Sequence, residues 1–416
     1  MKLQLDKILI SRENRFAKMQ KLKAAYNAVI TVKSNIPGDN KKLNIAYFLV
    51  KRYFKLIPKE LYDFFEFYDD FGGPYYLLGS NNNPKHIKKE LILIEENTKL
   101  GRFIDLDVYD GLKILSRGFM RKCYICDNPA FVCNRENNHS LDELLDFVKN
   151  KIKMVLVKET KNLIDKSILT ELNLHPKFGL VTPYTNGSHS DMNYSLMINA
   201  KDAILPYLVK MFEVGFCEIK IDSIFYKIRQ IGLEAEEAML NKTNNINAYK
   251  GLIFNMGLMV AAYGHVLYYN GSLDNIFDEV KEISKPVIKD FNTDINSFGL
   301  KAFKDFNIKG IRGEALNGFG SVKKALPYLK DLSDSSLIKT LIFIISEIED
   351  TVLLKRAKTY EFYLEIKKIF KQHLISNEEA ILSLNEFCLN NNLSFGGSAD
   401  LLVLTVFIKL IENQFY

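Results

Sequence analysis

The sequence predicts a mixed α/β or α+β domain at residues 1–150, followed by an all-helical domain at residues 151–416. Three observations lead to this prediction. A length of 416 residues suffices for two or three domains. Apolar and polar residues alternate with period two only in the first part, whereas three-to-four-residue apolar spacing fills the second part. The net charge of +6 lies entirely in residues 1–150, which hold 25 Lys and Arg against 19 Asp and Glu, while the rest holds 31 of each.

The predicted elements follow in chain order. Residues 8–26 predict an amphipathic basic helix, and residues 28–36 predict a strand that ends in the turn 35–38. Residues 101–108 predict a half-buried strand, because apolar side chains alternate there with Asp105 and Asp107. Apolar spacing then predicts helices at 141–173, 193–213, 223–241, 251–269, 276–290, 335–356, 360–373, 377–389 and 400–413.

Composition excludes several classes of protein. With 47% hydrophobic and 25% charged residues, the chain is neither disordered nor a disulfide scaffold, and its five cysteines are expected to be reduced thiols. The N-terminus lacks the apolar core of a signal peptide, so a cytoplasmic protein is expected. Residues 251–273 carry no Asp, Glu, Lys or Arg. Their glycines and asparagines favour a helix buried in a bundle over a membrane span, so no membrane partner is expected.

Asp105 and Asp107 form the clearest candidate site of the first part. Two residues apart on a strand, both carboxylates leave the same face, about 6–7 Å apart. Such a pair suits Mg²⁺ with phosphate oxygens as its remaining ligands. Arg102 and, farther off along the chain, Arg117 and Arg121 are candidates to hold phosphate. The alternative is a solvated strand face.

A cysteine cluster follows this strand. Cys123, Cys126, Cys133 and His139 offer three thiolates and an imidazole, the ligand types of a tetrahedral zinc site. Their spacing is not that of a familiar zinc finger, so buried reduced cysteines are the alternative.

In the second part, Gly396, Gly397 and Ser398 precede Asp400 and an apolar run, like a glycine turn that opens a helix. Its free amides suit a phosphate, while Ser398 as an ordinary N-cap is the alternative. Upstream, Arg229 and Glu236 share a helix face with Gly232 between them, which indicates close approach of a ligand or of a neighbouring helix.

The first part carries four ordered motifs: Arg12-Glu13-x-Arg15, Asn35-Ile36-Pro37-Gly38, Gly101-Arg102-x2-Asp105-x-Asp107 and Arg121-Lys122-Cys123-x2-Cys126 through His139. With these motifs it resembles the citrate lyase holo-acyl-carrier-protein synthase family along nearly all of residues 1–145. The resemblance implies a nucleotidyltransferase-type domain. It would transfer a phosphoribosyl-dephospho-CoA group from its triphosphate form to a serine of the acyl carrier protein subunit, releasing pyrophosphate. The resemblance further implies that Asp105 and Asp107 are catalytic and bind Mg²⁺, and that phosphate is bound by Arg12, Arg15, Lys41 and Arg102.

The second part carries a set of motifs at its polar loops and helix ends: Pro176-Lys177-x-Gly179-Leu180-Val181, Gly187-x-His189-x-Asp191-Met192, Arg229-x-Ile231-Gly232-x2-Ala235-Glu236, Lys250-Gly251, Arg312-Gly313-Glu314-Ala315, Asp350-Thr351 with Arg356, and Ser394-x-Gly396-Gly397-Ser398-Ala399-Asp400. With this set it resembles the triphosphoribosyl-dephospho-CoA synthase family along almost all of residues 165–410. That family joins the ribose of ATP to the 2′-hydroxyl of 3′-dephospho-CoA and expels adenine, which implies Mg²⁺ as a cofactor. The acidic candidates are Asp191, Glu236, Glu314, Asp350 and Asp400, of which Asp400 is also a candidate Mg²⁺ ligand. The candidates for substrate and phosphate binding are Lys177, Arg229, Lys250, Arg312, Arg356, Gly396, Gly397 and Ser398.

The second part also departs from its family's pattern. Phe178 and Phe395 replace prolines, Thr182 an aspartate, Tyr249 a histidine, and Ala357-Lys358 a glycine pair. Three interpretations therefore stand: a bifunctional enzyme, a transferase with an inactive synthase half, and a nucleic-acid-binding protein. Aromatic residues do not interleave with the basic N-terminus, so no nucleic-acid partner is expected.

Overall fold

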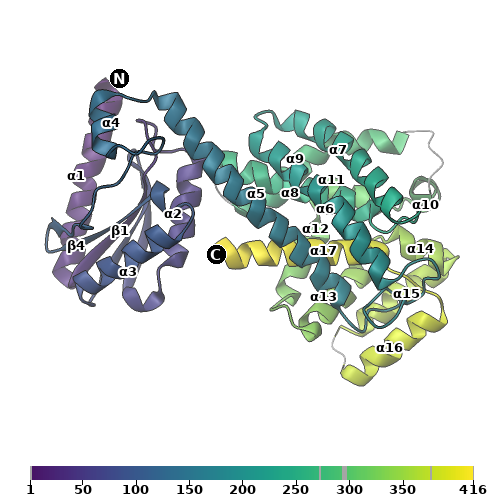
Figure 1. The fold of residues 1–416 in the computed structure, drawn as a ribbon. Helices are drawn as coiled ribbons and strands as arrows, with labels where there is room; N and C mark the ends of the chain where they lie inside the picture. The colour runs from purple at the N-terminus through teal and green to yellow at the C-terminus, as the bar shows by residue number, and fades with distance from the viewer. Residues whose placement is uncertain (1, 271–272, 293–297, 375–376, 416) are drawn as a thin grey trace. The chain divides into compact units, whose positions relative to one another are not determined.

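The computed structural model describes residues 2–270, 273–292, 298–374 and 377–415 (Figure 1). It contains two compact units, and the main division falls between Leu156 and Val157, inside helix α5 (Leu141–Asn173). We call them the N-terminal unit and the helical unit. Helix α5 has the bounds that its apolar spacing predicts.

The N-terminal unit contains a five-stranded antiparallel sheet of order β2-β3-β1-β4-β5, which makes it an α+β domain. Lys33 on central strand β1 lies opposite Asp105 on β4, and Thr31 lies opposite Asp107. Strand β4 begins later than predicted because residues 101–103 form a 3-10 turn. The strands are β1 (Ala28–Ser34), β2 (Phe64–Asp70), β3 (Gly73–Ser80), β4 (Ile104–Asp110) and β5 (Lys113–Ile114).

Helices cover both faces of this sheet. Met19 of α1 (Lys2–Ala25) packs on Val29, Tyr75 and Leu77. These side chains lie on one face of the sheet, and the buried Ile30, the neighbour of Val29 on β1, lies on the other face. On the other face, α2 (Asn44–Leu56) contacts β1 and β3, and α3 (Pro84–Asn97) contacts β4. The sequence did not predict these two helices or strands β2 and β3. The unit is completed by α4 (Ala130–Glu136).

Within its described residues, the helical unit contains no strand, as predicted. The predicted helix 335–356 is two helices, because residues 348–350 are not helical and Asp350 caps the second one. The helices are α6 (Tyr194–Cys217), α7 (Ile221–Lys242), α8 (Lys250–His265), α9 (Ile276–Ser284), α10 (Phe298–Phe306), α11 (Gly310–Leu316), α12 (Gly320–Ala325), α13 (Asp334–Glu347), α14 (Thr351–Ala357), α15 (Tyr360–Gln372), α16 (Glu378–Asn390) and α17 (Gly396–Phe415).

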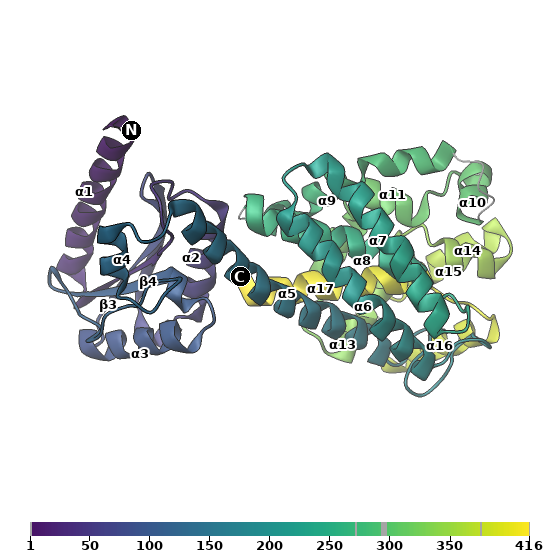
Figure 2. The ribbon, with the colours of Figure 1, turned by 45° about the horizontal axis from the view of Figure 1, so that its top comes forward.

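The apolar segment predicted as a buried helix belongs to this unit as far as Val266. Residues 250–268 are long and apolar enough to cross a membrane, but 83% of their most apolar window is buried. Helix α8 packs closely on α6, since a methyl group at Gly215 would lie 1.9 Å from the carbonyl oxygen of Ala261. Both views show α17, in yellow, running through the middle of the unit (Figures 1 and 2). Together α8 and α17 form the core that positions the loops of the site.

Candidate active sites

Asp105 and Asp107 lie on the same face of β4, as their spacing predicts, and each is paired with a cation. Asp107 Oδ2 lies 2.8 Å from Lys33 Nζ, and Asp105 Oδ1 lies 2.5 Å from Arg121 Nη1. Burial opposes ionisation of Asp107, but Lys33 outweighs it, with help from Lys88 and Arg117, and lowers the pKa of this carboxyl. The Lys33 ion pair therefore keeps Asp107 ionised at neutral pH. The ion pairs of Asp105 and Asp107 each use only one of the two carboxylate oxygens.

Glu95 of α3 anchors the cations beside these carboxylates. Its side chain is 3% exposed and forms ion pairs with Arg117 at 2.6 Å and Arg121 at 2.9 Å. It also accepts a hydrogen bond from the amide of Leu106 on β4. Sequence reasoning missed Glu95, because its partners Leu106, Arg117 and Arg121 lie further along the chain and no local pattern marks these contacts. The structure shows that it fixes two arginines at this edge of the sheet.

The four predicted phosphate ligands of this unit lie in different settings. The Arg15 guanidinium is already bound within the protein, because it makes a bidentate ion pair with Asp70 and stacks on the Tyr75 ring. Arg102 stacks on Tyr124 and donates to the carbonyl of Lys122.

Lys41 donates to the carbonyl oxygen of Ile36 at 2.6 Å. Burial and the nearby charge of Arg12 lower its pKa, while Asp105 raises it. Arg12, Lys41 and Asp105 therefore share one electrostatic neighbourhood. Arg102 joins them through Asn35, whose side-chain oxygen, in the orientation that satisfies its hydrogen bonds, accepts from Arg102 and Arg121 at 3.1 and 2.8 Å.

The cysteine cluster is assembled as predicted. The ligand atoms of Cys123, Cys126, Cys133 and His139 all lie within 4.8 Å of one another, so this cluster could hold a metal ion. Burial opposes ionisation of the Cys123 thiol, but the backbone amides of Cys126 and Ile125 point at it and lower its pKa to about 7. All five cysteines of the chain are free thiols.

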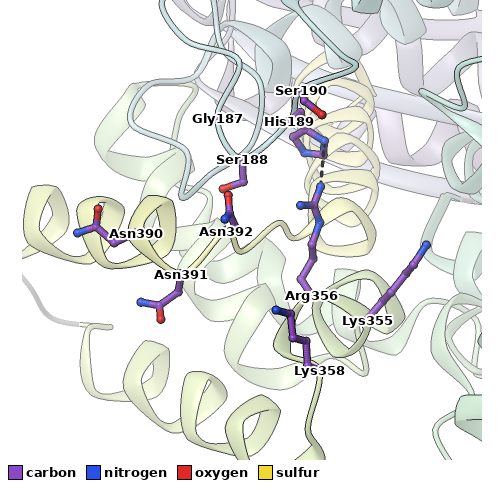
Figure 3. A pocket seen from close by; sticks show the side chains of 10 residues that line it. All are labelled: Gly187, Ser188, His189, Ser190, Lys355, Arg356, Lys358, Asn390, Asn391 and Asn392. Atoms are coloured by element: carbon purple, nitrogen blue, oxygen red, sulfur yellow. Dashed lines mark hydrogen bonds between the residues drawn. The ribbon is translucent and has the colours of Figure 1, made fainter.

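In the helical unit, a polar pocket of about 700 Å³ lies between the loop 187–190 and the C-terminal end of α14 (Figure 3). Three cations line it: Lys355, Arg356 and Lys358. Arg356 Nη2 lies 3.4 Å from His189 Nδ1, and burial together with this arginine lowers the pKa of His189. Asp191 lies 4.0 Å from His189, and its side chain is 60% exposed. Predicted residues from two distant motifs thus meet at a cationic pocket.

Four helices meet at their N-terminal ends close to the glycine motif. A methyl group at Gly251 of α8 would lie 2.2 Å from Asp400 Oδ2 of α17 and 3.9 Å from Ile311 of α11. One at Gly310 of α11 would lie 2.9 Å from Thr351 of α14, and one at Gly397 of α17 would lie 3.1 Å from Asp350. The positive ends of these helix dipoles therefore converge.

The Asp350 carboxylate already accepts hydrogen bonds from the N-terminal ends of two of these helices, α14 and α17. Asp350, 2% exposed, accepts hydrogen bonds from the amides of Val352 and Leu353 and from the amide and hydroxyl of Ser398. Ser398 lies in the first turn of α17 rather than at its N-cap, so the ordinary-cap alternative does not describe it. Burial raises the pKa of Asp400, and nearby Glu171 and Asp350 add to this. A phosphate at Ser398 would have to displace Asp350.

The remaining predicted residues form ion pairs elsewhere in the unit. Arg229 and Arg312 both approach Asp290, which sequence reasoning missed, at 2.9 and 3.8 Å. Glu236 pairs with Lys250, and both line a second pocket of about 390 Å³.

Two other predicted residues make internal contacts. Lys177 is buried and lies 2.9 Å from Glu171, so it points into the core rather than toward a pocket. Glu314 accepts from Ser321.

The departures from the family pattern have structural counterparts. Phe178 and Phe395, both fully buried, pack on Phe370 with ring centroids 5.2 and 5.0 Å apart, so the two replacements form one aromatic cluster. The Thr182 hydroxyl accepts from the amides of Tyr184 and Thr185, a turn that an aspartate would also make.

Two further replacements leave polar or strained groups in place. The hydroxyl of Tyr249 is buried and finds no hydrogen-bond partner among the residues that the structure describes. Lys358 has φ +66°, the region that a glycine would favour.

Comparison with known proteins accounts for both units. Residues 3–155 match the CitX family, apo-citrate lyase phosphoribosyl-dephospho-CoA transferase, and residues 158–416 match the CitG family, ATP:dephospho-CoA triphosphoribosyl transferase. Protein CitXG of Leuconostoc mesenteroides subsp. cremoris is 31% identical, over 99% of this chain and 98% of that protein. Protein CitXG of Haemophilus influenzae is 29% identical, over 77% and 76%.

A probable 2-(5''-triphosphoribosyl)-3'-dephosphocoenzyme-A synthase of Streptococcus equi subsp. equi is 32% identical, over 60% of this chain and 95% of that protein. The chain therefore belongs to the CitXG family, in which a phosphoribosyl-dephospho-CoA transferase and a triphosphoribosyl-dephospho-CoA synthase are joined in one polypeptide.

Proposed function

We propose that this chain builds the prosthetic group of citrate lyase in its helical unit and attaches it to the carrier subunit with its N-terminal unit. The first step joins the ribose of ATP to the 2′-hydroxyl of 3′-dephospho-CoA and releases adenine. The second transfers the phosphoribosyl-dephospho-CoA group to a carrier serine and releases pyrophosphate. The end-to-end match to a CitXG protein carries the proposal.

For the transferase step, the residues around Asp105 and Asp107 fit a Mg²⁺ ion. Each carboxylate keeps one oxygen outside its ion pair, on one strand face, and paired carboxylate oxygens suit this cation. When bound, Mg²⁺ polarises the reacting phosphate and neutralises the leaving pyrophosphate. Arg121, held by Glu95, lies where it can exchange Asp105 for a phosphate oxygen of the donor. Lys33, through its ion pair with Asp107, keeps that carboxylate ionised and able to bind the cation.

For the synthase step, the cationic pocket is the proposed triphosphate site. Lys355, Arg356 and Lys358 supply positive charge, and neutral His189 holds the Arg356 guanidinium at one edge. The reaction displaces adenine from the anomeric carbon, so a base must accept the proton of the 2′-hydroxyl. Asp191 meets this need best because it is exposed beside His189, whereas the carboxylate oxygens of Asp350 already accept four hydrogen bonds.

The protein partner is proposed to be the acyl carrier protein subunit, met in the cytoplasm. Carrier proteins of this system are acidic, and the charge surplus of this chain lies in residues 1–150. Lys18, Lys21 and Lys23 of α1 would form the docking surface. Charge reversal at these three lysines should lower the rate of carrier modification and its dependence on salt, without changing adenine release.

One assay tests the proposal. Purified chain is incubated with ATP, Mg²⁺, 3′-dephospho-CoA and apo carrier protein, and both free adenine and the mass of the carrier are followed. Adenine release with a mass increase on the carrier supports both steps. Labelling that requires preformed donor leaves a transferase with an inactive synthase half. Neither product, with substrates confirmed intact, overturns the proposed function.

A further inference from the structure

Four side chains of the N-terminal unit lie at the separations of a tetrahedral ligand shell. With Zn–S bonds of about 2.3 Å and Zn–N bonds of about 2.0 Å, neighbouring ligand atoms of such a shell lie roughly 3.6–3.8 Å apart. Cys126 Sγ lies 3.4 Å from both Cys133 Sγ and His139 Nε2. All four ligand atoms, with that of Cys123, fall within 4.8 Å of one another. Small side-chain adjustments, outward for the 3.4 Å pairs and inward for wider ones, would complete a Cys₃His shell.

The backbone around these ligands forms a compact knuckle, which we define as residues 121–139. The amide of Cys123 donates to the carbonyl of Asn128 at 2.7 Å, and that of Ala130 donates to the carbonyl of Arg121 at 2.9 Å. The first two thiols thus sit on a tight hairpin turn. Cys133 follows in helix α4, and His139 comes two residues after Asn137, whose left-handed backbone ends this helix. Local hydrogen bonds therefore set the spacing of all four ligands.

The knuckle is joined to the transferase site by its own first residues. Arg121 donates to Asp105 at 2.5 Å and to the carbonyl of Ile104 at 3.1 Å. Arg102 Nη2 donates to the carbonyl of Lys122 at 2.5 Å. Tyr124, between the first two cysteines, donates its hydroxyl to the carbonyl of Asn35. Whatever holds the knuckle in place therefore also holds Arg121, which pairs with Asp105, and Tyr124, which bonds to Asn35.

We propose that Cys123, Cys126, Cys133 and His139 bind one Zn²⁺ ion, which holds Arg121 and Tyr124 in place at the transferase site. Four protein ligands leave no open coordination position, so the ion is structural rather than catalytic. Binding releases the thiol protons and leaves three thiolates, one neutral imidazole and the dication. The metal site stands independently of the proposed function, and only its effect on carrier modification rests on it.

Metal content of the full chain tests the site directly. Protein prepared with reductant, loaded with zinc and desalted should hold about one zinc ion per chain, measured by inductively coupled plasma mass spectrometry. Replacement by Co²⁺ should give the visible absorption of a tetrahedral thiolate complex. Cys126→Ser should lose the ion, whereas Cys217→Ser, at an exposed cysteine outside the knuckle, should keep it. Zinc-free wild-type protein after loading, or a Cys126–Cys133 disulfide in reduced preparations, overturns the metal site.

A rescue variant separates positioning from folding. His139→Ala should lose zinc and carrier modification while adenine release continues, and His139→Cys should restore both the metal and the modification through a four-thiolate shell. If His139→Cys binds zinc but modification stays lost, or His139→Ala loses zinc and keeps full modification, the positioning role is wrong. Should wild-type protein fail to modify the carrier at all, zinc content still decides the metal site.

Discussion

Asp350 accepts hydrogen bonds at 2.9 Å from both the backbone amide and the hydroxyl of Ser398, 48 residues further along the chain. The same carboxylate caps α14 through the amides of Val352 and Leu353. One buried side chain thereby ties the N-termini of α14 and α17 together. Because buried amides that lose their acceptor are costly, this link is central to the helical unit.

Asp350→Ala should lower the free energy of unfolding of the helical unit by about 2 kcal/mol or more, and Ser398→Ala by about 1 kcal/mol. The double variant should lose less than the sum, since both changes remove the same contact. Urea unfolding of all four proteins measures the cycle. Strictly additive losses would mean that the two side chains do not interact.

Two helix glycines should respond in opposite directions to the same change. A methyl group at Gly232 would make ordinary contacts, 3.6 Å from Met211, so Gly232→Ala should stabilise the chain by about 1 kcal/mol and leave adenine release unchanged. At Gly251 the methyl group would collide with Asp400, so Gly251→Ala should destabilise the unit and slow adenine release. Thermal unfolding with the adenine assay compares the pair. Loss of activity in Gly232→Ala would assign a ligand to that position.

Lys358 combines an unfavourable backbone conformation with a place in the cationic pocket. Lys358→Gly should raise the free energy of unfolding by about 1 kcal/mol, because glycine adopts φ +66° without strain. It should also raise the KM for ATP by removing a cation. Lys355→Ala is the matched control, which removes a cation from the same pocket without relieving strain. A stabilised Lys358→Gly with unchanged KM would exclude Lys358 from ATP binding.

His189 should make the helical unit less stable in mild acid. Burial, then Arg356, lowers its pKa below the ordinary value of 6.5, so the unfolded chain binds this proton more readily than the folded chain. Stability contributed by neutral His189 is present above pH 6.5 and is lost as pH falls below it. The melting temperature of His189→Gln should therefore fall less than that of wild type between pH 7.5 and 5.5. The control variant His86→Gln, at an exposed histidine, should show the same fall in melting temperature as wild type. If the melting temperatures of wild type, His189→Gln and His86→Gln fall equally between pH 7.5 and 5.5, His189 does not cause the pH dependence.

The sequence predicted those features that depend on local spacing. Alternation placed Asp105 and Asp107 on one face, and short spacings gathered the ligands of the cysteine cluster. Contacts between residues far apart in the sequence could not be predicted, because no local sequence pattern indicates them. Glu95 and Asp290 each gather two arginines across tertiary contacts.

Buried polar residues explain the remaining differences. Lys177, predicted to bind phosphate, pairs with Glu171 in the core, because packing decides which way its side chain points. The break between α13 and α14 likewise comes from Asp350, whose second partner is far away in sequence. Sequence spacing thus predicts which residues are candidates for such a site, while tertiary packing decides which of their side chains come together.

The separation of the two activities between the two units is tested most directly by two variants in the carrier assay. Asp105→Asn should abolish carrier modification while adenine release continues at the wild-type rate. Arg356→Ala should reduce adenine release on the order of 100-fold but still modify the carrier from preformed donor. Carrier modification retained by Asp105→Asn, or adenine release lost with it, would contradict the assignment of the two reactions to two separate sites.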